Sequence, residues 1–368
     1  MTLDISMRIE DALRRQLNAG CAEGIFPGAS ASVAFWGNGG WQRVDACSGV
    51  RLEGGAEVTP DTIYDLASLT KPWVATAALR LYQAGLFALE APTAALIPEA
   101  TDLPIGERTW AEVLSHRSGL VAWEPFYERL SEEPGTDEAR AWILTDLLPR
   151  WDETTVGVSV YSDLGYILAG IAMARSAGAP LDELVAQRVA APLGLDETVF
   201  FGPSRRDETW KSECAPTGWS PWRARVLVGE VHDDNCAALG GVAGHAGMFG
   251  TARGVATFGA ACVGAWHGRR GALEEESIRF ATAPRAGGTH RLGWDGKSEK
   301  ERSAAGSLID ADAFGHLGFT GTSMWCDPRR QLVIVLLSNR VAVSDDNAAI
   351  RAYRPVFHDA VIAAFDDR

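Results

Sequence analysis

Apolar residues recur along this chain with two spacings, and the spacing changes with position. Near the N-terminus, Ile9, Leu13 and Leu17 follow one another every four residues, which is typical of one face of an amphipathic helix. Residues 27–35 and 41–47 are shorter apolar runs on either side of a glycine-rich turn. They predict the two strands of a β-hairpin directly after the first helix.

The helical spacing returns in the middle of the chain. Residues 67–87 predict a helix with a stop signal at Gly85. Because proline is tolerated in the first turn of a helix and not in its interior, Pro72 requires this helix to begin near Ser68. Residues 100–230 are predicted to be mainly helical and rich in loops, with helices near 109–116, 137–149 and 161–175.

Strand patterns reappear towards the C-terminus. The glycine-rich segment 240–250 leads into a predicted helix from about Arg253. Residues 315–326 and 331–337 predict the two strands of an antiparallel hairpin, with a turn between them. A last helix around 349–364 would cover that sheet.

Strands at both ends of the chain, with helices between them, predict an α+β fold. It would have an antiparallel sheet built from both termini, flanked by helices, with a mainly helical domain inserted. We predict that residues 1–66 and 240–368 form the sheet domain and residues 67–239 the inserted domain. An active site is then expected in the cleft between the two domains.

Composition and charge narrow the possible partners. The chain has 368 residues, of which 46% are hydrophobic, and a net charge of −14. This surplus of acidic residues argues against nucleic-acid and membrane partners, which require a basic face. The longest apolar run, Leu332–Leu337, is too short to span a bilayer, and charged residues interrupt the N-terminal segment where a signal peptide would be apolar. We therefore expect a cytoplasmic protein with a small-molecule partner, and nothing in the sequence indicates an oligomeric state.

Cysteine and histidine do not occur in metal-binding patterns. The six cysteines show no Cys-x-x-Cys spacing, and the seven histidines show no His-x-x-x-His spacing. We expect free thiols, no metal site and no cofactor.

The most informative short motif is a serine followed three residues later by a lysine. Lys71 is the only lysine among the first 210 residues. On a helix, Ser68 and Lys71 face the same side, so the amine can reach the hydroxyl. A partly buried lysine can lose its proton and act as a base, whereas an arginine stays charged. A Ser-x-x-Lys spacing also arises by chance, but the apolar neighbours of Lys71 make a purely structural lysine costly and favour an activated nucleophile.

Three further segments accompany this motif: Leu114–Leu120, Tyr161-Ser162-Asp163 and His316-Leu317-Gly318. In this order and spacing, nearly the whole chain resembles the superfamily of serine β-lactamases and penicillin-binding proteins. The branch that it resembles most contains class C β-lactamases, D-alanyl-D-alanine peptidases and family VIII carboxylesterases. The resemblance implies a β-lactamase/transpeptidase-like fold.

The resemblance can be followed residue by residue. Ser68 and Lys71 match the Ser-x-x-Lys motif of the superfamily. Tyr161 matches the tyrosine of its Tyr-x-Asn motif, where Asp163 stands in place of the asparagine. The third motif, Lys-Thr-Gly or its His-x-Gly variant, matches His316 and Gly318.

The resemblance implies acyl transfer in two steps. Ser68 would attack a carbonyl and form an acyl-enzyme, which water or another nucleophile then releases. Lys71 and Tyr161 would share the proton transfers, and the sequence leaves open which of them is the base. The backbone N–H groups of Ser68 and Phe319 would hold the oxyanion. His316 would contact the substrate or orient Tyr161.

Trp123 follows the Ser-Gly-Leu turn, and we predict that it contacts the substrate. His116 and His245 are predicted to be structural, satisfying the carbonyl groups of loops.

The departures from the family motifs bear on the substrate. The asparagine replaced by Asp163 donates its amide to a substrate carbonyl, and an ionised carboxylate cannot donate. His316 lacks the permanent charge of the lysine that helps to hold the carboxylate of penicillins and peptides. We therefore predict a serine hydrolase that acts as an esterase or amidase on small acyl compounds. A β-lactamase or D-amino-acid peptidase is the alternative enzyme, and an inactive ligand-binding homologue is the alternative from another class.

Overall fold

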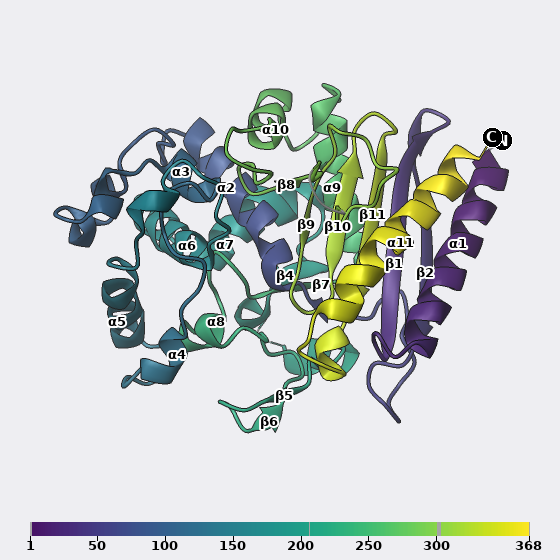
Figure 1. The fold of residues 1–368 in the computed structure, drawn as a ribbon, viewed down its shortest axis with the longest axis horizontal. Helices are drawn as coiled ribbons and strands as arrows, with labels where there is room; N and C mark the ends of the chain where they lie inside the picture. The colour runs from purple at the N-terminus through teal and green to yellow at the C-terminus, as the bar shows by residue number, and fades with distance from the viewer. Residues whose placement is uncertain (1, 206, 300–302, 368) are drawn as a thin grey trace.

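The centre of the structure is a six-stranded antiparallel sheet. This computed structural model describes residues 2–205, 207–299 and 303–367. In the strand order, strands from the N-terminal part of the chain lie beside strands from its C-terminal part (Figure 1). From one edge to the other, the strands are β2 (Gly40–Gly49), β1 (Gly28–Gly37), β11 (Leu332–Ser338), β10 (Ser323–Asp327), β9 (Phe314–Leu317) and β8 (Asp295–Gly296).

Helices cover both faces of this sheet because its central strands are apolar on both sides. In β11, Leu332, Ile334 and Leu336 pack into the same core cluster as the apolar face of helix α1 (Thr2–Ala22). The alternate residues of β11 belong to the other core cluster, with helix α9 (Ala252–Trp266). Helix α11 (Ala348–Asp366) lies beside α1 on the first face (Figure 1).

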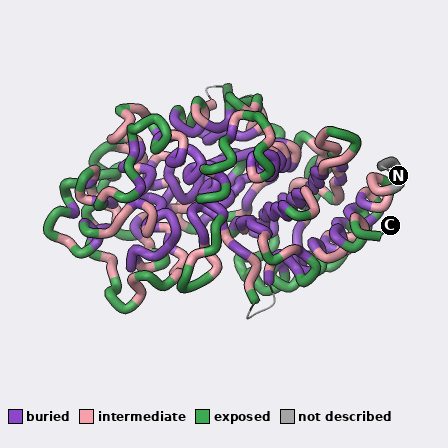
Figure 2. The backbone as a smooth tube through the Cα atoms, turned by 90° about the horizontal axis from the view of Figure 1, so that it is seen from above, coloured by how far each residue is buried: buried purple, intermediate pink, exposed green. Residues whose placement is uncertain are grey.

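The middle of the chain forms a mainly helical part next to the sheet (Figure 1). Its central helix is α2 (Thr70–Gln83), which is buried from Thr70 to Leu79 and packs against α6 (Asp163–Ala177) and α7 (Leu181–Val185). The remaining described α-helices are α3 (Trp110–Leu114), α4 (Phe126–Arg129), α5 (Asp137–Leu147), α8 (Asp234–Ala238) and α10 (Glu275–Thr282). Seen from above, the buried segments run through the interior of the molecule and exposed segments surround them (Figure 2).

Two small strand groups lie outside the main sheet. Strands β3 (Tyr64–Asp65), β7 (Met248–Gly250) and β4 (Val199–Phe201) form one sheet, and β5 (Trp219–Ser220) pairs with β6 (Arg225–Val226). The first group joins segments from both sides of the predicted domain boundaries. The division at residues 66/67 and 239/240 stays a prediction.

The predicted fold class and the order of its elements are confirmed. The first helix, the first hairpin, the helix after residue 67 and the closing helix all lie where the pattern predicts them. The prediction of one strand over 315–326 is wrong, because the chain turns back between β9 and β10. Gly318 N–H donates to the carbonyl of Thr322 at 2.8 Å, and Gly321 takes a φ of 110°, which favours glycine.

The described part of the chain was also searched for membrane spans. No single helix in it has the length and apolar character needed to cross a bilayer. Only Asp163–Ala177 together with Leu181–Leu193 passes that test, as a pair bent by 82°.

Candidate active site

Ser68 lies in a strained turn between strand β3 and helix α2. The turn is a short 3-10 segment, Ala67–Leu69, and Ala67 takes a φ of 47°, in the left-handed region. Buried Asp65 holds this turn, because its carboxylate accepts the backbone N–H of Ala67 at 2.8 Å and that of His232 at 2.6 Å. Pro72 falls in the first turn of α2, as predicted from its tolerance there.

Lys71 reaches Ser68 from the next turn and is completely buried. Its Nζ lies 2.9 Å from Ser68 Oγ, 2.6 Å from Asp163 Oδ1 and 3.0 Å from the carbonyl oxygen of His245. An ammonium group has three N–H donors, so each donor has one acceptor. Burial lowers the pKa of Lys71, and Asp163 opposes that shift. The lysine is thus held in place by its partners while its loss of a proton is made easier by burial.

Tyr161 approaches Ser68 from the other side. Its hydroxyl donates to Ser68 Oγ at 2.7 Å, although the two residues are 93 positions apart in the chain. Burial, and then the neighbouring Asp163, raises the pKa of Tyr161 well above its usual value. At neutral pH the side chain is therefore a phenol that can donate a proton.

Asp163 is the first residue of helix α6. Ser162 caps that helix, since its hydroxyl accepts the backbone N–H of Gly165 at 3.2 Å. The Asp163 side chain is 16% exposed and forms an ion pair with Lys71. The sequence predicts Asp163 at the substrate, and the structure adds a contact of this carboxylate with Lys71.

Ser68, Tyr161 and Asp163 line a cleft of about 430 Å³. Trp123 and Phe319 form part of its wall and remain 47% and 48% exposed. The other residues of its wall are Ala67, Ser68, Ala122, Tyr127, Tyr161, Asp163, His232, Asp233 and Asp234. The wall therefore combines aromatic surface with three carboxylates, and the predicted substrate contact Trp123 does lie there.

The third motif lies at the end of β9. Gly318 touches the segment before Ser68, since a Cβ placed on it would come within 2.7 Å of the Leu66 carbonyl oxygen. His316 is only 4% exposed, and its ring centroid lies 6.0 Å from that of Tyr161. Burial, and then the charge of Lys71, lowers the pKa of His316 to about 3, so it is neutral. His316 is not among the residues that line the cleft, and which of its two expected roles it fills stays a prediction.

The two histidines predicted to serve loop carbonyls have other partners. His116 Nδ1 accepts the backbone N–H of Ser162 at 3.0 Å, and its ring lies against Tyr161 with centroids 4.8 Å apart. His245 Nε2 lies 2.9 Å from Asp233 Oδ1. The expectation about loop carbonyls is therefore wrong. Both residues instead contact residues of the site: His116 contacts Tyr161, and His245 contacts Asp233.

Asp233 is a residue that the sequence analysis missed. Burial raises its pKa, but His245 and the backbone N–H of Cys236 outweigh burial and lower the pKa to about 2. It also caps helix α8 by accepting that N–H at 2.7 Å. An aspartate before a short helix is a common cap, so nothing in the sequence marked it as part of a site.

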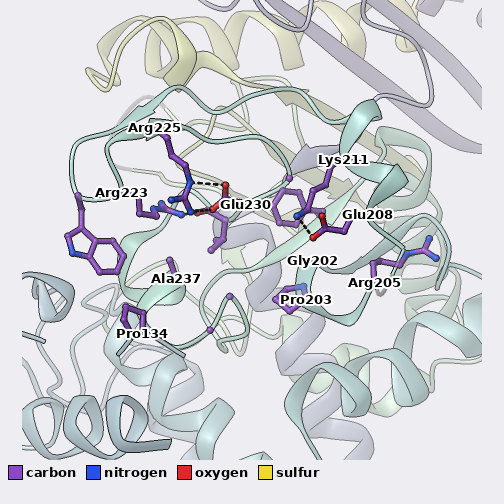
Figure 3. A pocket seen from close by; sticks show the side chains of 16 residues that line it. Pro134, Gly202, Pro203, Arg205, Glu208, Lys211, Arg223, Arg225, Glu230 and Ala237 are labelled. Atoms are coloured by element: carbon purple, nitrogen blue, oxygen red, sulfur yellow. Dashed lines mark hydrogen bonds and ion pairs between the residues drawn. The ribbon is translucent and has the colours of Figure 1, made fainter. Parts of the chain in front are cut away.

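A second cavity, of about 530 Å³, lies beside the segment that leads to His232 (Figure 3). Two ion pairs lie in its wall: Arg225 contacts Glu230 at 2.5 Å, and Lys211 contacts Glu208 at 2.6 Å. No residue of the predicted site lines it. Within the described residues, no group of three or more histidine, cysteine, aspartate or glutamate side chains could hold a metal ion.

Comparisons with known proteins identify the family of this chain. A family model described as Beta-lactamase matches residues 13–356. "Putative D-alanyl-D-alanine carboxypeptidase" of Escherichia coli (strain K12) is 29% identical over 313 residues, covering 79% of this chain and 72% of that protein. "N-acetylmuramyl-L-alanine amidase" of Bacillus subtilis (strain 168) is 30% identical over 308 residues, covering 77% of this chain and 69% of that protein.

Solved structures share the fold at lower sequence identity. "EstCE1, a hydrolase with promiscuous acyltransferase activity" aligns with a TM-score of 0.75 and 20% identity, covering 97% of this chain and 99% of that one. A class C β-lactamase from Rhodobacter sphaeroides aligns with a TM-score of 0.70 and 18% identity, covering 95% of this chain and 99% of that one. Since the family model covers most of the chain, the protein belongs to the Beta-lactamase family and is a serine hydrolase of that family.

Proposed function

We propose that the protein hydrolyses small, uncharged esters and amides through an acyl-enzyme on Ser68. The observation that carries this proposal is the pair of contacts at Ser68 Oγ, 2.9 Å to Lys71 Nζ and 2.7 Å to the Tyr161 hydroxyl. A nucleophile with a basic and an acidic group in hydrogen-bond reach is the arrangement that acyl transfer requires.

The directions of the two pKa shifts favour different roles for Lys71 and Tyr161. Lys71, whose pKa burial lowers, takes the proton of Ser68 as the oxygen attacks the substrate carbonyl. Tyr161, whose pKa burial raises, gives its phenol proton to the departing alkoxide or amine and is reprotonated from Lys71. The oxyanion is bound by the backbone N–H groups of Ser68 and Phe319. Water then attacks the acyl-enzyme by the same steps in reverse and restores Ser68.

The charges around the cleft support an uncharged substrate. Asp163, Asp233 and Asp234 face it, and Lys71 is buried beneath it. Among the described residues that line the cleft, no lysine or arginine is present to bind a substrate carboxylate. A neutral acyl compound avoids the repulsion that a carboxylate would meet there.

The alternative is a cell-wall amide or a lactam. The names of the Escherichia coli and Bacillus subtilis relatives both refer to the cleavage of amide bonds. This supports the inclusion of amides in the proposal, and it keeps a D-amino-acid peptidase or β-lactamase as the second candidate. An inactive binder is less consistent with the complete set of Ser68, Lys71 and Tyr161 contacts.

Hydrolysis of three substrates by the parent and by Ser68→Ala tests the proposal. The substrates are p-nitrophenyl butyrate, a chromogenic cephalosporin and a D-alanyl-D-alanine peptide, and Ser131→Ala, an exposed serine outside the cleft, is the control. We expect ester turnover that disappears in Ser68→Ala and persists in Ser131→Ala. Equal turnover by Ser68→Ala would overturn the acyl-enzyme, and faster turnover of cephalosporin or peptide would favour the alternative. If no substrate is turned over, a serine-directed covalent probe separates a narrow hydrolase from an inactive binder.

We also propose that the protein acts in the cytoplasm, without nucleic-acid or membrane partners. All six cysteines are free thiols, which suits a reducing compartment, and the net charge is −14. Fractionation of cells that produce the natural protein tests this, and recovery in a membrane or exported fraction would overturn it.

A further inference from the structure

A buried arginine donates a hydrogen bond to the peptide group between Gly318 and Phe319. Arg354, on helix α11, donates from Nη2 to the carbonyl oxygen of Gly318 at 2.7 Å and to that of Thr322 at 2.8 Å. The arginine is 5% exposed, and burial, together with Arg340, lowers its pKa to about 9. At neutral pH the guanidinium is therefore still charged.

The hydrogen bond to the Gly318 carbonyl fixes the direction of the Phe319 N–H, which belongs to the same peptide group. A trans peptide group is planar, and its C=O and N–H point in opposite directions. With the Gly318 carbonyl turned towards Arg354, the N–H of Phe319 points away from helix α11. No acceptor for this N–H is found among the described residues, and Phe319 lines the cleft together with Ser68.

The next peptide group along the chain is held by a second arginine. Arg340 donates from Nε to the carbonyl oxygen of Phe319 at 2.9 Å, and its guanidinium lies 4.5 Å from the centroid of the Phe319 ring. Arg340 lies two residues after the end of strand β11, so this hydrogen bond ties the turn to that strand.

The same turn is tied to the segment that carries the nucleophile. Thr320 Oγ1 donates to the carbonyl of Asp65 at 2.8 Å, and Thr322 Oγ1 donates to that of Leu66 at 3.1 Å. The turn that carries the N–H of Phe319 is therefore bound to the two residues, Asp65 and Leu66, that precede the Ala67–Leu69 segment.

We propose that Arg354 is a positioning residue for catalysis, which orients and polarises the Gly318–Phe319 peptide so that its N–H binds the oxyanion. A charged donor on the carbonyl oxygen draws electron density from the amide and strengthens the N–H as a donor. This inference rests on the proposed acyl-enzyme chemistry at Ser68. It adds a residue from a helix that touches neither the nucleophile nor the cleft.

A purely structural role for Arg354 makes a different prediction. In that case the arginine would satisfy two buried carbonyl groups, and its loss would lower stability and the fraction of folded enzyme. The properties of each folded active site would stay the same. A readout of the oxyanion hydrogen bonds in the acyl-enzyme separates the two roles.

The test compares Arg354→Met and Arg354→Lys with Arg351→Met, an exposed arginine one turn earlier on the same helix. Two quantities are measured: kcat and KM for p-nitrophenyl butyrate, and the infrared stretching frequency of the ester carbonyl in a slowly deacylating acyl-enzyme. We expect kcat to fall roughly 10- to 100-fold in Arg354→Met with KM little changed, as for a weakened oxyanion donor. The carbonyl band should move to higher frequency, because weaker hydrogen bonds leave more double-bond character.

Arg354→Lys keeps the positive charge without the planar guanidinium, so we expect smaller changes in the same direction. If Arg354→Met does not fold, the carbonyl band of Arg354→Lys decides. A band at the parent frequency in a folded Arg354 variant would overturn the inference, whatever its stability. Failure of the chemistry itself is recognised separately, since Ser68→Ala would then match the parent and no acyl-enzyme would form.

Discussion

Lys71 Nζ lies 2.6 Å from Oδ1 of Asp163, the residue that replaces the asparagine of the superfamily motif. The Lys71 side chain is fully buried, and the Asp163 side chain, which lines the cleft, is 16% exposed. Burial lowers the pKa of Lys71, whereas the carboxylate stabilises the ammonium form and opposes the shift. The balance of these two effects sets the fraction of neutral amine available to accept the proton of Ser68 at a given pH.

We expect Asp163→Asn to move the acidic limb of the kcat/KM profile to lower pH. Without the carboxylate, the pKa of Lys71 falls further, and its neutral form persists into more acidic solution. A nearby opposite charge shifts a pKa by roughly 1 to 3 units, so the limb should move by about one unit or more. The other titratable groups near Lys71 are unchanged in this variant; they include Tyr161, Asp233, Cys236, His116, His290 and His316.

The measurement is the pH dependence of ester hydrolysis by the parent, Asp163→Asn and Asp234→Asn. Asp234 lines the same cleft but pairs with Arg223 at 2.7 Å, so its variant should keep the parent profile. An acidic limb that stays in place in Asp163→Asn would show that this ion pair does not control the titration of the base.

Tyr161→Phe should slow the hydrolysis of an alkyl amide much more than that of a p-nitrophenyl ester. The phenol is assigned to protonate the leaving group, and p-nitrophenolate leaves without a proton whereas an amine does not. General acid catalysis contributes roughly 100- to 10,000-fold, so the amide rate should fall by about 100-fold or more. Tyr166→Phe is the control, because that hydroxyl is also buried but donates to the Leu114 carbonyl at 2.8 Å. Equal losses on both substrates would assign Tyr161 to nucleophile activation instead.

Local patterns in the sequence were enough to predict the main elements of the fold. The four-residue spacing of Ile9, Leu13 and Leu17 reflects one buried helix face, and the apolar run of β11 reflects a strand buried on both sides. Pro72 located the start of α2 because its effect on a helix is local. The turn between β9 and β10 was missed, since it depends on the contact between Gly318 and Thr322 in three dimensions.

Only the site residues that belong to sequence motifs were predictable. Ser68 and Lys71 share one helical turn, and Tyr161 followed from the resemblance to a family. The ion pair of Asp163 with Lys71 joins residues 92 positions apart, and no spacing rule indicates it. Arg354 was likewise not predictable, because a single arginine in a helix predicted to cover the sheet carries no sign that it reaches a distant turn.

Trp123→Ala is expected to raise KM for esters with longer acyl chains while kcat changes little. The indole forms part of the cleft wall, is 47% exposed and makes neither of the two hydrogen bonds described at Ser68 Oγ. Its loss therefore removes apolar surface for binding and leaves the chemistry intact. Trp219→Ala removes an indole that is 60% exposed and lies outside the cleft, and it should leave KM unchanged. A series of p-nitrophenyl esters of increasing chain length measures the effect. If KM for Trp123→Ala matches that of the parent across the series, the substrate does not bind against this side chain.

Buried neutral histidines should make the protein sensitive to acid. His358 is 0% exposed, and burial lowers its pKa to about 4, while burial and Lys71 lower that of His316 to about 3. In the unfolded chain each imidazole titrates near its ordinary pKa of about 6.5. Between that value and the folded pKa, the unfolded state binds a proton that the folded state does not. The free energy of unfolding therefore decreases as pH falls through this window, by about 1.4 kcal/mol per pH unit for each such group.

Replacing His358 removes one of these groups and leaves the catalytic residues in place. His358 lies against the sheet, where its ring nitrogens contact the Ala304 carbonyl at 2.8 Å and Ser323 Oγ at 3.2 Å. We expect His358→Gln to lose less stability than the parent when pH is lowered from about 6.5 to about 4.5, a window set by the two pKa values. Urea denaturation at several pH values measures this slope, and His267→Gln, at an exposed histidine, should behave as the parent does. If the slopes of His358→Gln and the parent coincide, His358 takes up its proton in the folded state as readily as in the unfolded chain, and the acid sensitivity must come from other groups.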